Sequence, residues 1–454
     1  MPMFMPVFIK ALFIFISTAI ISTSLNAQST QNNQLGQSAL SSSIDSAMPK
    51  LEKWYLHFHQ YPELSYQERQ TAKMMAKTMA EMGVEVTSDI GGHGVVGVYE
   101  NGDGPTILIR TDLDALPITE QTQKPYASKV MQLDKNNNKV GVMHACGHDI
   151  HMVSLLGTAE QLIKHRHDWQ GTLILLAQPA EEVGGGAKAM LKEGIFNDFP
   201  LPDYILALHV NAELPAGKVG ITSGYALANV DSVDIKIKGV GGHGAYPHET
   251  IDPIVLASRM VLALQTIGSR EISPLEPNVI TVGAIQGGTK HNIIPNEVQL
   301  ALTLRSYEPQ VRLQQINALK RMVNGIAISA GVPQDLMPEF IVHEGERIPS
   351  TYNDPALTAQ IRLSIEEELG ADNVMTLPAV MAGEDFGLYG KTKENRPISL
   401  FWLGAVNKGK YANSLANEEV LPSLHSSQFA PDYPETIHTG VRAMTASAMG
   451  LFNQ

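Results

Sequence analysis

The chain has 454 residues, of which 44% are hydrophobic and 17% are charged. Single hydrophobic cores stop growing near roughly 250 to 300 residues, so this length excludes a small single domain and predicts a globular protein of two domains. The formal net charge of −13 and the absence of a basic run exclude nucleic acid and other polyanions as expected partners.

The N-terminal segment is typical of a secretory signal peptide. Lys10 precedes an apolar run over 11–21, and small and polar residues follow up to Ala27. The run is shorter than the ~20 apolar residues that cross a bilayer, so cleavage near Ala27 is favoured over a retained membrane anchor. The sequence therefore predicts a signal peptide over 1–27, export to the periplasm or beyond, and a flexible leader over 28–45.

From Leu51 onward, apolar segments of strand length alternate with longer helical patterns, which is typical of an α/β fold with a mostly parallel sheet. Apolar residues between Ile150 and Ile163 recur at helical spacing, so a helix is predicted to begin near Asp149, with that residue as its N-cap. The predicted strands of this domain are 95–99, 106–110, 172–177, 204–208 and 398–403.

The middle of the chain has a different pattern. Its predicted elements are strand 231–238, helix 253–267, strands 278–285 and 297–304, helix 310–328 and strand 339–342. The order β-α-β-β-α-β is the ferredoxin-like arrangement. It predicts an α+β domain over 229–344, inserted into a catalytic domain formed by 46–228 and 345–454.

Acids and imidazoles follow several predicted strands. Asp112 and Asp114 follow strand 106–110, Glu181 and Glu182 follow strand 172–177, and His209 closes strand 204–208. Because ligands bind at the carboxyl ends of the strands in open α/β sheets, we expect these side chains to share one crevice.

Cys146 is the only cysteine, so the chain cannot form an intramolecular disulfide. It is either a small buried hydrophobe or a ligand or nucleophile. Cys146 and His148 could contact one ion from a turn made permissive by Gly147, and thiolate with imidazole suits zinc, with Asp114 or Asp149 orienting the ligands. A purely structural turn is the alternative.

Glu181 and Glu182 are adjacent carboxylates, which repel each other. A metal ion commonly holds such a pair together, with one acid as ligand and the other as general base towards an attacking water. Two solvated acids on a loop are the alternative, but the glycines at 184–186 allow close backbone approach.

His243, Asn292 and Arg305 lie in the inserted domain and supply donors suited to an oxyanion and a substrate carboxylate. Taken alone, each of these residue types is more often structural. His57 and His59 are interpreted as structural residues on a helix face.

Nine short segments are spread in order over nearly the whole mature chain. They are Pro62-Glu-Leu-Ser, 110–117, 143–149, Gln178-Pro-Ala-Glu-Glu, Leu208-His-Val, Gly241-Gly-His, Asn292 with Ile294-Pro295, Gly383-Glu-Asp-Phe and Leu424-His425. Together they resemble the amidohydrolase branch of the di-metal peptidases related to carboxypeptidase G and aminoacylase, which includes hippurate hydrolases and auxin-conjugate hydrolases.

The resemblance implies two divalent ions, zinc or manganese, with Glu181 as general base. It also implies a homodimer formed through the inserted domain, in which His243 reaches the partner's site, Asn292 and Arg305 bind substrate, and Glu384 and Asp385 support the site. Gly244, Ala301 and Ser427 depart from the family pattern without removing a ligand. The implied metal ligands are Cys146, His148, Glu182, His209 and His425.

The predicted function is hydrolysis of the amide bond of N-acyl amino acids or similar small conjugates. Three alternatives are a metallo-dipeptidase or carboxypeptidase acting on small peptides, an enzyme with Cys146 as nucleophile, and a noncatalytic binding protein. The last two leave the acids, and Glu181 in particular, without a role.

Overall fold

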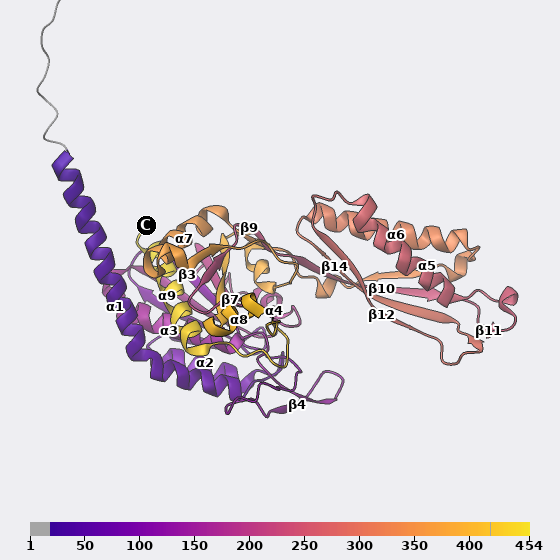
Figure 1. Ribbon diagram of the computed structural model, residues 1–454, viewed down its shortest axis with the longest axis horizontal. Helices are drawn as coiled ribbons and strands as arrows, with labels where there is room; N and C mark the ends of the chain where they lie inside the picture. The colour runs from indigo at the N-terminus through magenta and orange to yellow at the C-terminus, as the bar shows by residue number, and fades with distance from the viewer. Residues whose placement is uncertain (1–18, 418) are drawn as a thin grey trace, which may run out of the picture.

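The computed structural model describes residues 19–417 and 419–454. A larger part holds the central sheet, and a smaller part extends to one side of it (Figure 1). Most of the predicted signal peptide lies outside the described residues. Within those residues, no helix combines the length and the apolar character that crossing a bilayer requires.

The expected flexible leader is helical, which corrects the sequence prediction for that segment. Helix α1 (Ala19–Gln60) contains all of 28–45. The composition of this segment is that of a linker. It contains no proline, however, so every residue keeps the backbone N–H group that a helical hydrogen bond requires.

The larger part is built on an eight-stranded sheet whose four central strands, β6, β3, β7 and β18, run parallel. The mostly parallel sheet predicted from the sequence is confirmed. Antiparallel strands occur towards both edges. In spatial order the strands are β1 (Glu85–Ile90), β2 (Gly94–Asn101), β6 (Gly171–Gln178), β3 (Thr106–Asp112), β7 (Tyr204–Pro215), β18 (Ile398–Val406), β8 (Val219–Ile221) and β17 (Val374–Thr376).

Helices cover both faces of this sheet because alternate strand residues point to opposite sides. Ile107 and Ile109 of β3 pack into one core with most of the helices, whereas Leu108 packs into a second core with α4 (Gly186–Lys192) and the short helix η7 (Asp385–Lys391). The helices of the first core are α1, α2 (Arg69–Glu81), α3 (His148–Lys164), α7 (Pro355–Leu369) and α9 (Tyr433–Phe452).

Two local predictions in this part are wrong. The N-cap of α3 is Gly147, not Asp149, because the chain enters the helix through a left-handed conformation, φ +79°, that glycine adopts without strain. His209 does not close its strand, because β7 continues to Pro215 through pairing with β18. His209 therefore projects from within a strand.

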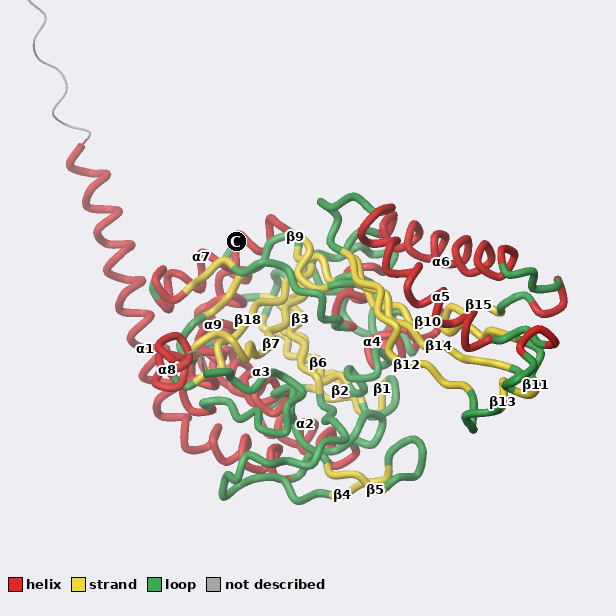
Figure 2. Tube along the Cα trace, turned by 45° about the vertical axis from the view of Figure 1, so that its right-hand side comes forward, coloured by secondary structure: helices red, strands yellow, loops and turns green. Residues whose placement is uncertain are grey.

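The smaller part confirms the ferredoxin-like order. Its antiparallel sheet has the order β12-β14-β10-β15, and α5 and α6 lie together over one face with their own core (Figures 1 and 2). The elements are β10 (Asn229–Lys238), α5 (Pro253–Thr266), β12 (Asn278–Gly287), β14 (Glu297–Ser306), α6 (Pro309–Ser329) and β15 (Glu339–Val342).

The described structure also contains short two-stranded ribbons, the helix α8 and several short helical turns. β9 pairs with β16 where the chain leaves and re-enters the larger part, and β11 pairs with β13 in the smaller part. These elements are β4 (Met131–Leu133), β5 (Lys139–Gly141), β9 (Gly224–Leu227), β11 (Gly242–His243), β13 (Ile293–Ile294), β16 (Thr351–Asn353) and α8 (Lys408–Asn417).

Candidate metal centre

Five side chains from four separate segments meet beyond the central strands. Cys146 Sγ lies 3.5 Å from His209 Nε2 and 3.3 Å from His425 Nε2. Glu182 Oε2 lies 3.5 Å from His425 Nε2, and Glu182 Oε1 lies 3.8 Å from His148 Nε2. The structure thus brings together all five ligands that the resemblance implied.

These donors form two triads that share the thiol. Cys146, His148 and His209 place one ligand atom each within 4.8 Å of one another, and so do Cys146, Glu182 and His425. The Cys146 sulfur could therefore serve as a ligand in either triad. Thiolate, imidazole and carboxylate together suit a borderline-soft divalent metal.

Two polar atoms of this cluster lack hydrogen-bond partners among the described residues. His148 Nε2 and Glu182 Oε1 are buried without a hydrogen bond to another described residue, which is costly unless a further ligand is bound. Burial, followed by the charges of Glu182 and Glu181, raises the pKa of the Cys146 thiol well above its usual range. Burial also raises the pKa of Glu182 to about 8. A bound cation favours the charged form of each group, so the residues fit divalent ions.

Glu181 lies beside the triads and is 7% exposed. Its Oε2 is 3.9 Å from His148 Nε2, and it faces a second pair of acids, Glu384 and Asp385. Burial raises the pKa of Glu181 well above its usual range, and the neighbouring charges of Glu384 and Glu182 add to the effect. A carboxyl group with a raised pKa can exchange protons near neutral pH.

The turn that carries Glu181 and Glu182 is held by two other acids. Ala180 adopts φ +51°, a strained value for a non-glycine residue, and its N–H donates to Glu68 Oε1 at 2.8 Å. Asp114 accepts from the N–H groups of Glu181 and Glu182 at 3.1 and 3.0 Å. These three hydrogen bonds therefore fix the backbone from which the two carboxylates project.

Asp114 and Asp149, the two acids expected to orient the metal ligands, contact different residues. The backbone oxygen of Asp114 accepts from His148 Nδ1 at 2.7 Å, which leaves Nε2 facing the cluster. The Asp149 carboxylate instead lies 2.7 Å from Nδ1 of His59, whose other nitrogen lies 3.2 Å from Glu120. Asp149 therefore acts on the site through the packing of α3 against α1 and not through a ligand.

Sequence reasoning missed Arg110 and His151 as site residues. Arg110 is buried and pairs with Asp112 at 2.7 Å, Glu384 at 2.8 Å and Asp385 at 3.1 Å. His151 Nδ1 lies 2.7 Å from Asp112 Oδ1, and its Nε2 accepts from a backbone N–H of β7 at 2.9 Å. His151 stands three residues after His148, a helical spacing that was available as a signal.

His243, Asn292 and Arg305, the three candidate residues of the inserted domain, lie at two opposite ends of its sheet. His243 of β11 is exposed and adjacent to Asn292, whose backbone oxygen accepts from the Gly244 N–H at 2.9 Å. Figure 1 shows β11 at the end of the inserted domain that points away from the larger part. Arg305 lies at the opposite end of the sheet, where its side chain packs against Gly383, the residue before Glu384. A Cβ atom added to Gly383 would lie 3.0 Å from Arg305 Nη1. Arg305 alone approaches the candidate centre of its own chain.

Comparisons with known proteins agree with this geometry. Residues 108–442 match the family described as Peptidase family M20/M25/M40. The chain is 34% identical over 391 residues to thermostable carboxypeptidase 1 of Saccharolobus solfataricus, covering 84% of this chain and 92% of the relative. It is 35% identical over 378 residues to the IAA-amino acid hydrolase ILR1-like 2 of Arabidopsis thaliana, covering 81% and 82%.

A solved structure of a dinuclear metal-binding peptidase of the M20 family from Bacillus subtilis superimposes with a TM-score of 0.71 at 29% identity, covering 90% of this chain and 99% of that chain. The resemblance inferred from the sequence motifs is confirmed. The chain belongs to peptidase family M20/M25/M40 and is a metal-dependent hydrolase.

Proposed function

We propose that the protein hydrolyses the amide bond of N-acyl amino acids or similar small conjugates. The observation that carries the proposal is the position of Glu181, a buried acid that lies outside both triads containing Cys146 and has a carboxylate oxygen within 4.8 Å of ligand atoms of His148 and Glu182. A binding protein needs ligands but no such acid. The relative named as an IAA-amino acid hydrolase supports an amide between an acyl group and an amino acid.

The residues of this chain suggest a division of work during hydrolysis. Divalent ions held by the two triads would polarise the amide carbonyl and lower the pKa of water. Glu181 accepts the proton of the attacking water and later donates it to the leaving amine. Arg305, next to Gly383, is placed to bind the carboxylate of the amino acid part, and Asp114 keeps Glu181 in place.

A carboxypeptidase acting on small peptides is the second candidate, because a relative of similar identity bears that name. Benzoylglycine and N-acetyl amino acids should be compared with free-amino dipeptides of matched sequence, using protein reconstituted with zinc or with manganese. We expect kcat/KM to be at least about tenfold higher for the N-acyl compounds. A preference for dipeptides would support the second candidate instead. The same assay identifies which of the two metals gives the more active enzyme.

We also infer that the protein is a homodimer formed through the inserted domain. β12 has ten residues and lies at the edge of the inserted sheet, where β14 is its one partner strand among the described residues. Its Ile285 is 55% exposed. An unpaired edge strand with an apolar side chain is a template for pairing with a second copy. This pairing would carry His243 of one subunit towards the metal centre of the other.

Export remains a proposal that rests on the N-terminal sequence alone. We expect the mature protein, isolated from its native cells, to begin near Gln28 and to lie outside the cytoplasm. N-terminal sequencing of the purified protein and cell fractionation test both parts. An intact N-terminus that fractionates with membranes would support a retained anchor.

A further inference from the structure

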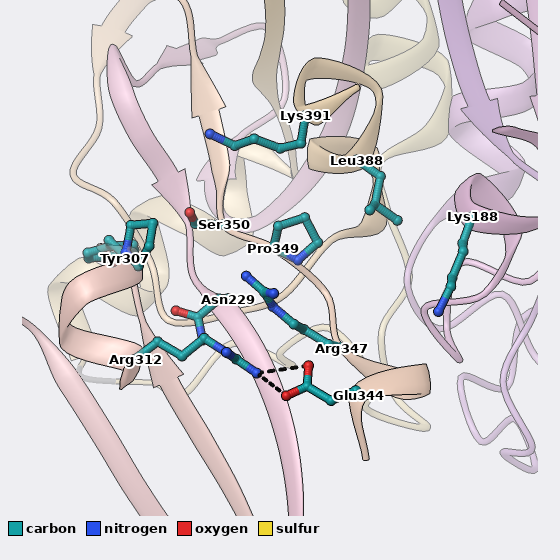
Figure 3. Close-up of a pocket in the computed structure, with 11 residues that line it drawn as sticks. Lys188, Asn229, Tyr307, Arg312, Glu344, Arg347, Pro349, Ser350, Leu388 and Lys391 are labelled. Carbon is teal, nitrogen blue, oxygen red and sulfur yellow. Dashed lines mark hydrogen bonds and ion pairs between the residues drawn. The ribbon is translucent and has the colours of Figure 1, made fainter. Parts of the chain in front are cut away.

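A pocket of about 370 Å³ lies at the junction of the two domains. Figure 3 shows side chains from the inserted domain, including Tyr307 and Arg312, facing Leu388 and Lys391 of the larger part. None of the lining residues is a candidate metal ligand. The pocket is therefore a separate feature from the metal centre, and its volume falls within the range of small-molecule sites.

Positive charge dominates the lining of this junction pocket. Four cations, Lys188, Arg312, Arg347 and Lys391, face one acid, Glu344, in a protein whose net charge is −13. Arg312 is already neutralised, because it pairs with the buried Asp231 at 2.6 Å and with Glu344 at 3.2 Å. The excess charge is thus carried by the other three cations.

Those three cations have no carboxylate partner among the described residues. Lys188 donates to a backbone oxygen, and Lys391 lies over the ring of Tyr352. Arg347 is half-buried, and its Nε is buried without a hydrogen-bond partner in the described structure. Figure 3 shows its side chain running into the middle of the pocket, past Pro349. A buried guanidinium N–H without an acceptor favours an anionic ligand.

Apolar surface completes the lining. Leu388, Pro309 and Pro349, together with the ring of Tyr307, contribute to the same pocket. From these observations we propose that the junction pocket binds a small dianion, either a dicarboxylate or a phosphate monoester with a compact apolar body. Arg347 and Lys391 contact the charged groups. Because the lining comes from both domains, the bound molecule contacts both and restrains their relative motion.

Phenyl phosphate and phthalate are suitable probes, since both are dianions with an aromatic ring, one a phosphate monoester and the other a dicarboxylate. Binding is measured by calorimetry on the metal-loaded enzyme, with benzamide as the neutral probe. We expect one or both dianions to bind, and Arg347→Gln and Lys391→Gln each to weaken that binding by at least about tenfold. Benzamide should not bind at the junction pocket.

Lys393→Gln is the matched control, because Lys393 is exposed two residues from Lys391 and does not line the pocket. Its dissociation constants should equal those of the wild type. Lys391 is exposed, so Lys391→Gln should fold like the wild type. This variant therefore tests the proposal even if Arg347→Gln does not fold. The proposal is overturned if neither dianion binds. It is also overturned if the dissociation constants are equal in wild type, Lys391→Gln and Lys393→Gln. Because the readout is binding and not hydrolysis, this result is independent of the proposed substrate.

Discussion

Arg110 and Glu384 are 274 residues apart in the chain, yet Nη2 of Arg110 lies 2.8 Å from Oε1 of Glu384 with both side chains fully buried. The same guanidinium pairs with Asp112 and Asp385. One cation thus compensates three buried acids directly behind Glu181. This contact ties the two halves of the discontinuous larger part together beneath the candidate metal centre.

Arg110→Met should lower the free energy of unfolding by about 3 to 5 kcal/mol, because it leaves buried carboxylates without their cation. Urea unfolding followed by circular dichroism measures the change. Arg259→Met is the control, since Arg259 is exposed and donates to the Ser329 hydroxyl; its effect should stay under about 1 kcal/mol. Equal effects of the two substitutions would contradict the role given to Arg110.

Glu181→Gln should leave the metal content unchanged and lower kcat on the order of a thousandfold, because the amide cannot shuttle the proton. Metal analysis and steady-state kinetics check the two parts. Glu213→Gln, at an exposed position of β7, should behave as wild type. Substantial activity in the Glu181 variant would refute the assignment of Glu181 as general base.

Asp114→Asn should weaken metal binding by about 10- to 100-fold, as is typical for residues that orient ligands. The Asp114 carboxylate accepts from the N–H groups of Glu181 and Glu182 and from the Ser65 hydroxyl at 2.6 Å, and an amide has only one accepting oxygen. Competition with a chelator measures the affinity. Asp149→Asn should reduce the metal affinity less than Asp114→Asn does, since Asp149 faces His59. A larger loss of affinity in Asp149→Asn would contradict the role given to Asp114.

The raised pKa of the buried His59 imidazole predicts that the free energy of unfolding depends on pH. Burial alone would lower its pKa, but hydrogen bonds to Asp149 and Glu120 raise the pKa to about 9. Because this folded pKa is above the unfolded value of about 6.5, the stabilisation is complete below about pH 6.5 and is lost as pH rises through about 9.

The difference in unfolding free energy between wild type and His59→Gln should therefore be larger at pH 6 than at about pH 9.5. Urea titrations at the two pH values measure it. His57→Gln is the control on the same helix, because His57 is exposed and its substitution should have little effect at either pH. A gap for His59→Gln that does not change with pH would contradict the charged state assigned to the imidazole.

Subunit mixing tests whether His243 acts across a dimer. Glu181→Gln and His243→Ala should each be nearly inactive as homodimers. In a mixed dimer, one site combines an intact Glu181 with the partner's intact His243. After exchange of equal amounts, activity should recover to about a quarter of wild type, since half of the dimers are mixed and each has one complete site. No recovery in dimers shown to have exchanged would place His243 outside the partner's site.

Local pattern was sufficient for most elements of the fold. The alternating strand 339–342 and the buried strand starting at Thr106 were predicted with correct starts, because period-two alternation and continuous apolar runs are properties of neighbouring residues. The edge strand β1 was missed, since most of its residues are exposed and it is stabilised by pairing with β2. The helical leader also lay beyond what composition indicates, and the permissive turn at Gly147 was predicted without its role as the N-cap of α3.

The sequence by itself identified the family, and it predicted the ligand set and Glu181 as general base, because chemistry at a metal centre requires particular side chains in recognisable short segments. Only the tertiary structure decided which donors share Cys146, that Arg110 compensates the acids behind Glu181, and that Arg305 but not His243 approaches its own centre. Those relationships join residues hundreds of positions apart. They depend on how sheets and helices pack, which local spacing does not specify.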